Sequence, residues 1–139
     1  MIVLDTNVVA EMMAKTPNPS VLGYLNTLTE PPCLSAITLA EVRFGVALLP
    51  NGRRKRSLSK AAEDLVAGLG PDRILTFSNT TATCYADVVS RRRKAGRPVS
   101  QFDGAIAASC IEHKAVLVTR NIKDFEETGI SLINPWVSE

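Results

Sequence analysis

The sequence is poor in the residues on which many catalytic and secreted proteins depend. Its 139 residues include a single histidine, His113, and three cysteines that lie far apart and form no C-x-x-C motif. One histidine disfavours both a two-histidine ribonuclease mechanism and a Ser-His-Asp triad. An odd number of scattered cysteines argues against a disulfide framework and against a zinc knuckle. We therefore expect Cys33, Cys84 and Cys110 to be buried as small apolar side chains.

Long apolar runs and phosphate-binding loops are absent as well. No run approaches the ~20 apolar residues that cross a bilayer. The apolar start Ile2-Val3-Leu4 meets Asp5 at once, which is not the pattern of a secretory signal. Neither G-x-x-x-x-G-K-S/T nor G-x-G-x-x-G occurs, which argues against the usual modes of nucleotide binding. We therefore expect a cytoplasmic protein with no membrane partner.

The composition is that of an ordinary globular domain, with 45% hydrophobic and 22% charged residues. Its length suits one domain, residues 1–139. Short apolar stretches alternate with longer helical segments, which is typical of a parallel sheet covered on both faces. We predict an α/β fold, a three-layer α/β/α sandwich with a mostly parallel sheet of about five short strands. Strands are expected at 2–4, 33–35, 73–76, 115–118 and 131–133, and helices at 8–13, 20–28, 39–49, 53–69, 80–95 and 101–113.

Polar side chains stand where several of these strands end. Asp5 follows the first strand directly, and Glu41 lies in the helix that follows the second. Thr119 and Asn121 follow the fourth strand, and Asp103 lies in the first turn of the helix that leads into it. Open parallel sheets bind their ligands outside the carboxyl ends of the strands. Their joint placement therefore predicts a functional site at this edge, provided that the helix of Asp103 begins there.

A cluster of carboxylates predicts a divalent cation. Like charges at one edge repel one another, and a cation removes that cost. Magnesium and manganese prefer oxygen ligands, and magnesium retains waters that leave room for phosphate oxygens. One metal would acidify a bound water, and a second, ~3.5–4 Å away, would stabilise the leaving oxygen. The chemistry that this implies is hydrolysis of a phosphodiester.

Each of these residues also has a purely structural interpretation. Asp5 could cap the first helix, and Thr38-x-x-Glu41 matches a capping box. Asp103 is favoured near a helix N-terminus by the helix dipole alone. Asn121 and Asp124 suit an ordinary turn. These alternatives stay open at the level of single residues.

Four ordered segments of the chain form a pattern. They are Ile2-Val3-Leu4-Asp5-Thr6-Asn7, Ser35-Ala36-Ile37-Thr38-Leu39-Ala40-Glu41, Gln101-Phe102-Asp103-Gly104-Ala105-Ile106-Ala107-Ala108 and Val118-Thr119-Arg120-Asn121-Ile122-Lys123-Asp124-Phe125. Together these segments resemble the PIN-domain ribonucleases. Their order, their spacing and the chain length are similar to the VapC-type toxins of type II toxin–antitoxin pairs. The ending Asn134-Pro135-Trp136 is similar to the FitB-like group among them, as is the segment 41–47. The resemblance spans essentially the whole chain.

The resemblance implies an endoribonuclease that depends on Mg²⁺, with Mn²⁺ as the other suitable ion. It also implies a homodimer and a cognate antitoxin, with DNA contacted only indirectly through that antitoxin. The matching motif positions make Asp5, Glu41 and Asp103 the metal ligands. The same motifs give assisting roles to Thr6 and Asn121, beside the accessory candidate Thr119.

One departure from the family pattern concerns the fourth polar position. Many members have an aspartate where this chain has Asn121, and an amide contributes no charge. Asp124, three residues later, would share a helical face with Asn121 if that turn is helical, and it could then supply the missing charge. The fourth position is therefore open between Asn121 and Asp124, and a second metal site depends on which of them serves. This departure supports a second hypothesis, a catalytically weak PIN module that acts as a binding partner in a toxin–antitoxin–DNA complex. Receiver and haloacid-dehalogenase-like domains fit less well, because Asp5-Thr6-Asn7 has neither the acidic pair nor the Asp-x-Asp that they need.

Basic residues are concentrated in two runs, although the net charge is only +2. Arg53, Arg54, Lys55 and Arg56 begin a helix, where cations oppose the helix dipole, so phosphate binding is a reasonable function for them. Arg91, Arg92, Arg93 and Lys94 end a helix, where cations are favoured in any case. We expect RNA contacts from the first run and from Arg91 and Arg92. Aromatic residues are 5% of the chain, so RNA recognition should depend mainly on backbone charge and shape.

The apolar side chains near the end of the third helix have two interpretations. They belong to the core, or they cover a dimer or antitoxin surface. The residues concerned are Phe44, Val46, Leu48 and Leu49.

Overall fold

The computed structural model describes residues 1–137. Its strands pair in parallel, β1 with β4, β4 with β5, and β2 with β3. A parallel bridge between Val3 and Cys33 joins the two groups, because Leu4 N–H donates to the Cys33 carbonyl at 3.1 Å. The order across the sheet is therefore β3-β2-β1-β4-β5. The strands are β1 (Ile2–Leu4), β2 (Leu34–Ser35), β3 (Ile74–Leu75), β4 (Val116–Val118) and β5 (Ser131–Ile133).

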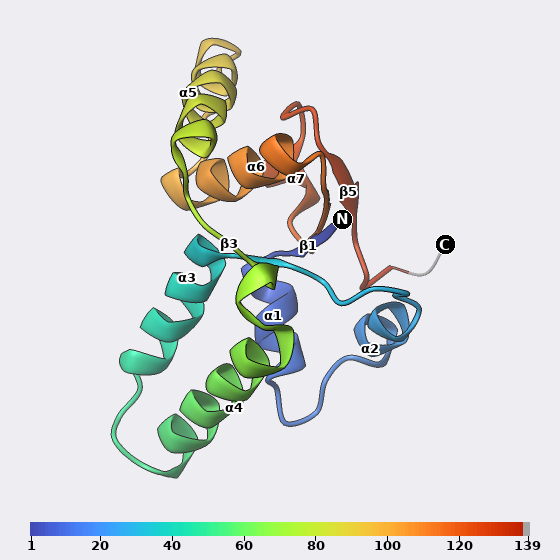
Figure 1. Ribbon diagram of the computed structural model, residues 1–139, viewed down its shortest axis with the longest axis vertical. Coiled ribbons are helices and arrows are strands. Elements are labelled where there is room, and N and C mark those ends of the chain that lie inside the picture. The colour runs from blue at the N-terminus through green and yellow to red at the C-terminus, as the bar shows by residue number, and fades with distance from the viewer. Residues whose placement is uncertain (138–139) are drawn as a thin grey trace.

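Helices cover both faces of this sheet. Figure 1 shows α5, α6 and α7 on one side and α1 to α4 on the other. The predicted three-layer α/β/α sandwich is thus confirmed. The helices are α1 (Thr6–Met12), α2 (Pro19–Asn26), α3 (Ala36–Ala47), α4 (Arg53–Leu69), α5 (Asn79–Lys94), α6 (Gln101–His113) and α7 (Ile122–Phe125), with a 3₁₀ turn, η1, at Pro71–Arg73.

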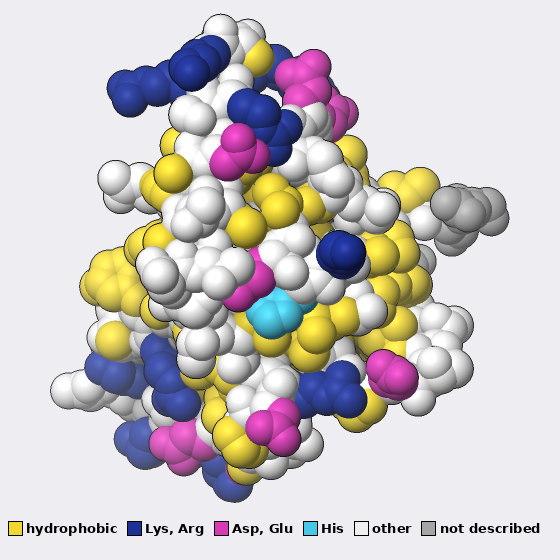
Figure 2. All heavy atoms as spheres, turned by 45° about the horizontal axis from the view of Figure 1, so that its top comes forward, with side chains coloured by type: hydrophobic (Ala, Val, Ile, Leu, Met, Phe, Trp, Pro, Cys, Tyr) yellow, Lys and Arg dark blue, Asp and Glu magenta, His cyan; other side chains and the backbone are white. Residues whose placement is uncertain are grey.

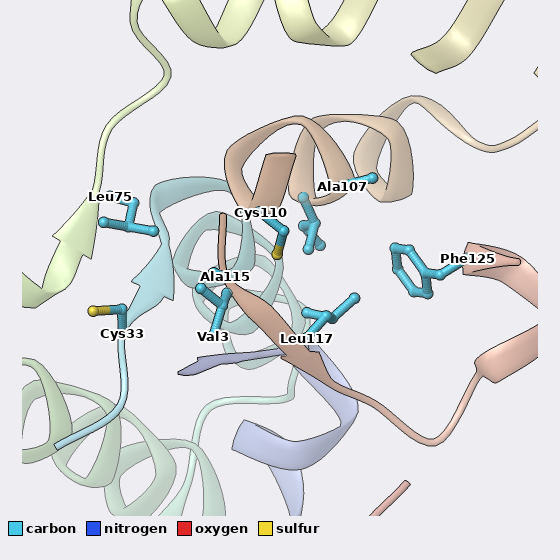
Figure 3. Packing of buried hydrophobic residues seen from close by; sticks show 9 residues of the cluster. Val3, Cys33, Leu75, Ala107, Cys110, Ala115, Leu117 and Phe125 are labelled. Carbon is cyan, nitrogen blue, oxygen red and sulfur yellow. The ribbon is translucent and has the colours of Figure 1, made fainter. Parts of the chain in front are cut away.

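Each strand contributes side chains to two cores, because successive residues point to opposite faces. Val3 and Leu117 pack with α6, and Phe125 points toward them from α7 (Figure 3). The next residues along the strands, Leu4 and Val118, pack on the other face with the buried side chains of α1 to α4. Burial on both faces explains why the strands appear in the sequence as continuous apolar runs.

Every predicted strand and helix is present, with differences at the ends. The helix expected from residue 39 begins at Ala36, because Ser35 ends β2 and at once caps α3 by accepting the Ile37 N–H at 3.1 Å. The turn expected after Asn121 is the short helix α7. Among residues 1–137, no helix is both long enough and apolar enough to span a membrane.

The cysteines are all free thiols. Cys33 and Cys110 are buried, as predicted, whereas Cys84 is only half-buried. Burial, and then the nearby charge of Asp5, raise the pKa of Cys110 to about 12. The Cys110 thiol is therefore protonated at neutral pH and serves the core.

Candidate active site

The strand order reverses between β1 and β4, because β2 and β3 extend the sheet in one direction and β5 extends it in the other. Such a reversal leaves a crevice at the carboxyl ends of the two strands, where open α/β sheets bind their ligands. Asp5 follows β1 and Thr119 follows β4, and the Asp5 N–H donates to the Val118 carbonyl at 2.9 Å. These two residues therefore lie side by side at the reversal.

Asp5 is 3% exposed and is held on both carboxylate oxygens. Its Oδ1 accepts the Thr6 N–H at 2.8 Å, which caps α1. Its Oδ2 accepts the Thr119 hydroxyl at 2.7 Å and the Asn7 side-chain amide at 3.1 Å. The capping interpretation of Asp5 is thus correct, and it is compatible with a role in the site, because the bonds that cap the helix also orient the carboxylate.

Thr119 and Asn7 connect the ends of β1 and β4. The Thr119 hydroxyl is fully buried and accepts the Asn121 N–H at 3.0 Å. The Asn7 amide also approaches this hydroxyl at 3.5 Å, and Asn7 Oδ1 accepts the Arg120 N–H at 3.1 Å. Sequence reasoning did not assign Asn7 to the site. The only signal for it was its place two residues after Asp5.

Glu41 faces the same crevice from α3. Its Oε1 accepts the Thr6 hydroxyl at 2.8 Å, across 35 residues of sequence. The capping-box interpretation of Glu41 is wrong, because the cap of α3 is Ser35. Thr38 instead lies inside the helix, and its buried hydroxyl has no hydrogen-bond partner among residues 1–137.

Asp103 enters from the first turn of α6, where its N–H donates to Ser100 Oγ at 3.2 Å. The pKa of its carboxyl group is raised to about 6, mainly by burial and then by the negative charges of Asp5, Asp124 and Glu41, while a hydrogen bond with Ser100 acts in the opposite direction. These charges act on Asp103 only because their carboxylates are near it. The predicted ligands Asp5, Glu41 and Asp103 therefore share one electrostatic environment.

Two residues, Asn121 and Asp124, were the candidates for the fourth polar position of the site. Asn121 occupies the cap position of α7, yet its exposed side chain makes no hydrogen bond among residues 1–137. Asp124 lies in the first turn of α7, and its charge raises the pKa of Asp103. The negative charge that Asn121 lacks is thus present at Asp124.

The donor set suits a hydrated divalent cation. All four carboxyl groups offer oxygen, which Mg²⁺ and Mn²⁺ prefer. Within the described part of the chain, no three acidic, histidine or cysteine side chains already converge on one coordination sphere. Magnesium commonly uses one or two carboxylates and retains waters. A cation would also relieve the repulsion that raises the pKa of Asp103.

The single histidine lies away from this cluster. His113 ends α6, whereas Asp103 is in its first turn. Ten residues of helix separate them by roughly 15 Å at ~1.5 Å per residue. His113 instead lies 3.7 Å from Glu112.

Lys and Arg gather over the far end of α5, with acidic groups close by, and over the connection between α3 and α4 (Figure 2). At the far end of α5, the expected RNA contact of Arg92 is corrected. Arg92 is 5% exposed, and its guanidinium donates to the carbonyls of Arg97 and Glu126. The other expected contact, Arg91, is exposed and pairs with Asp87 at 3.3 Å.

The first basic run begins α4 beyond the far end of α3. Arg53, Arg54 and Arg56 are exposed there, while Lys55 Nζ donates to the Ala47 carbonyl at 3.1 Å. Glu41 lies six residues before Ala47 on α3, which separates this run from the carboxylates by roughly 9 Å of helix or more. Three cations of this run thus remain available to a long polyanion.

Comparisons with known proteins agree with this geometry. The family model for the PIN domain matches residues 2–130. "VapC ribonuclease Y4jK" of Sinorhizobium fredii is 37% identical over 137 residues, with 98% of each chain covered. "Toxin FitB" of Neisseria gonorrhoeae is 39% identical, with 98% of this chain and 99% of that protein covered. A solved structure described as "Structure of FitAB bound to IR36 DNA fragment" superposes with a TM-score of 0.92 at 39% identity, covering 100% of this chain and 98% of that chain. This chain belongs to the PIN domain family.

Proposed function

We propose that this protein is a metal-dependent endoribonuclease and the toxin of a toxin–antitoxin pair, acting as a single PIN domain over residues 1–139. The observation that carries the proposal is the electrostatic coupling of Asp103 with Asp5, Glu41 and Asp124 where the strand order reverses. The relatives support both parts of the proposal, since one is named a ribonuclease and another a toxin.

The residues of the site divide into ligands and supports. Asp5, Glu41 and Asp103 would hold Mg²⁺ or Mn²⁺, and Asp124 adds a fourth negative charge. When bound, a divalent cation acidifies a water molecule and stabilises charge on phosphate oxygens. Thr6 orients Glu41 through its hydroxyl. Thr119 likewise orients Asp5, so the two carboxylates would hold the cation from fixed directions.

Partner binding is the second part of the proposal. Phe44 is 63% exposed and Leu48 is 69% exposed, one helical turn apart at the end of α3. The core interpretation is therefore wrong for these two, and Val46 and Leu49 are half-buried beside them. We infer that a cognate antitoxin or the second subunit of a homodimer covers them. In such a cytoplasmic toxin–antitoxin complex, DNA would be contacted through the antitoxin.

The test is RNA cleavage by the purified protein, freed of its antitoxin, with Mg²⁺ or Mn²⁺. The wild type should cut structured RNA, and Asp5→Asn and Glu41→Gln should each abolish cutting. Asp72→Asn is the matched control, since Asp72 is an exposed carboxylate in η1, just before the amino end of β3. Persistent cutting by a folded Asp5→Asn protein would overturn the assignment of the site.

The alternative, a catalytically weak binding module, is favoured by two observations. The amide of Asn121 replaces a charge, and the described acidic side chains have not converged on one coordination sphere. Tight binding of the antitoxin, with no cutting of transfer, ribosomal or messenger RNA by the wild type in either metal, would establish this alternative in place of the nuclease.

A further inference from the structure

Arg120 stands directly after Thr119 at the end of β4, beside the carboxylates but not paired with them. Its N–H donates to Asn7 Oδ1 at 3.1 Å, and the same Asn7 side chain donates to Asp5. The backbone of Arg120 is thus tied through one side chain to the buried carboxylate of the site. Its own side chain is exposed.

The guanidinium group of Arg120 is held over an aromatic ring. Its Cζ lies 5.2 Å from the ring centroid of Trp136, within the range of a cation–π contact. Trp136 is itself fixed, because its backbone N–H donates to Asn134 Oδ1 at 2.9 Å and its side chain packs against the apolar core. Stacking occupies one face of the guanidinium and leaves its N–H groups, which lie in the plane, free to donate.

No anion within the described chain uses these donors. None of the ion pairs among residues 1–137 includes Arg120. A fixed, exposed and unpaired guanidinium at the same edge of the sheet as the carboxylates is suited to an external anion.

The positions of Arg120 and Trp136 limit which anion the Arg120 guanidinium can meet. Asp5 follows β1, Arg120 follows β4 and Trp136 follows β5, and these three strands are neighbours. Neighbouring strands lie about 4.8 Å apart, so the pair is displaced from Asp5 by roughly 5–10 Å along the edge. Successive nucleotides of one strand rise by ~3.4 Å or more. Arg120 is therefore displaced by more than one nucleotide rise from a phosphate bound at the carboxylates.

We propose that Arg120, braced by Trp136, binds an RNA phosphate that flanks the cleaved one, and so sets the direction in which the strand crosses the site. This inference rests on the proposed nuclease function. It assigns to Arg120 substrate binding, with no part in holding the metal. Trp136 acts through Arg120 as a positioning residue.

The first test measures binding of a fluorescently labelled single-stranded RNA over a range of NaCl concentrations, with Mg²⁺ present and Asp103→Asn as a background that prevents cleavage. Arg120→Gln should weaken binding about 10-fold at low salt and reduce the slope of log affinity against log salt by about 0.7. Arg120→Lys should restore the slope. The matched control is Lys114→Gln, which removes one exposed cation just before the opposite end of β4.

The second test separates binding from chemistry in the cleaving protein. Arg120→Gln should raise KM about 10-fold and leave both kcat and Mn²⁺ affinity close to the wild type. Trp136→Leu should weaken RNA binding when Arg120 is present and add no further loss in the Arg120→Gln protein. An unchanged salt slope, or a loss of Mn²⁺ affinity, would overturn the assignment of Arg120.

The outcomes also separate this inference from the proposed function. If the wild type cuts RNA and Arg120→Gln behaves like Lys114→Gln, only the role of Arg120 fails. If the wild type cuts no RNA, the nuclease proposal fails, and the binding measurements then decide whether Arg120 contacts RNA at all.

Discussion

The Thr119 hydroxyl donates to Asp5 Oδ2 at 2.7 Å across 114 residues of sequence, and both side chains are buried. Through this bond, the end of β4 fixes a carboxylate that follows β1. The same hydroxyl accepts the Asn121 N–H, so it also fixes the start of α7. One buried oxygen thus joins two segments of the site that are distant in sequence.

Replacing this hydroxyl should affect both stability and activity. Thr119→Val keeps the shape but removes the shortest hydrogen bond to Asp5 Oδ2, which then has only the Asn7 amide as a donor, and it leaves the Asn121 N–H without its acceptor. We therefore expect the free energy of unfolding to fall by about 1–3 kcal/mol. RNA cleavage should fall by about 10–100-fold, because the ligand loses its support. Thr119→Ser should retain most of both. Urea unfolding and initial cleavage rates measure the two effects.

The control for this variant is a second buried threonine, whose hydroxyl bonds to none of the carboxylates of the site. Thr128 is 1% exposed and donates to the Phe125 carbonyl at 2.5 Å. Thr128→Val should lower the unfolding free energy to a similar extent, with little change in cleavage below its melting temperature. Equal losses of cleavage in both variants would show that Thr119 acts through stability alone.

The charge of Asp103 should make stability depend on pH in the metal-free protein. Its folded-state pKa is about 6, above the ~3.9 of an unfolded aspartate. The native state therefore binds the proton more tightly, and ionised Asp103 destabilises the fold at higher pH. Relative to Asp103→Asn, the wild type should lose stability as the pH rises from roughly 4 to above 6, and then level off. Saturating Mg²⁺ should offset this loss of stability in the wild type, because the cation neutralises the ionised carboxylates.

Urea unfolding of both proteins in EDTA across this pH range is the measurement. Asp72→Asn serves as the control, since Asp72 is an exposed carboxylate outside the site. A difference between wild type and Asp103→Asn that stays constant with pH would contradict the raised pKa of Asp103.

Much of the fold and the site is predictable from the sequence, for a physical reason. The strands are buried on both faces and therefore appear as short apolar runs, which located all of them. Asp5 and Thr119 were identified because they follow such runs directly, and parallel strands bring their carboxyl ends to one edge. This reasoning needs only the order of the segments along the chain.

Contacts between distant segments were not predictable in the same way. Arg92 belongs to a basic run that looks like surface, yet it is buried because the Arg97 and Glu126 carbonyls surround its guanidinium. The bond between Asn7 and Arg120 spans 113 residues. The start of α3 was placed too late, because Ser35 serves both as the last residue of β2 and as the helix cap.

The fourth acidic position is tested by comparing Asp124 with Asn121. Asp124→Asn removes a charge that acts on Asp103, so it should lower the Asp103 pKa and weaken Mn²⁺ binding by about 10-fold. Asn121→Ala keeps the backbone N–H that donates to Thr119, and it should change Mn²⁺ affinity little. Isothermal titration with Mn²⁺ compares the two. A larger loss in Asn121→Ala would assign the metal contact to Asn121 instead.

The packing of α6 against α5 sets the position of Asp103, and Gly104 allows that packing. A Cβ atom at Gly104 would lie 2.7 Å from Val89 Cγ2 and 3.2 Å from the Tyr85 ring, both on α5. Because valine has few alternative rotamers in a helix, Gly104→Ala must separate the two helices, which should cost about 1–3 kcal/mol. The shift also moves the adjacent Asp103, so cleavage should fall even at temperatures where the protein is folded.

Gly23→Ala, in the middle of α2 with no atom within 4 Å of its added Cβ, is the control and should raise stability by up to about 1 kcal/mol. Thermal unfolding and cleavage rates of the two variants are measured in parallel. Equal stabilities of Gly104→Ala and Gly23→Ala would contradict the tight contact between Gly104 and α5.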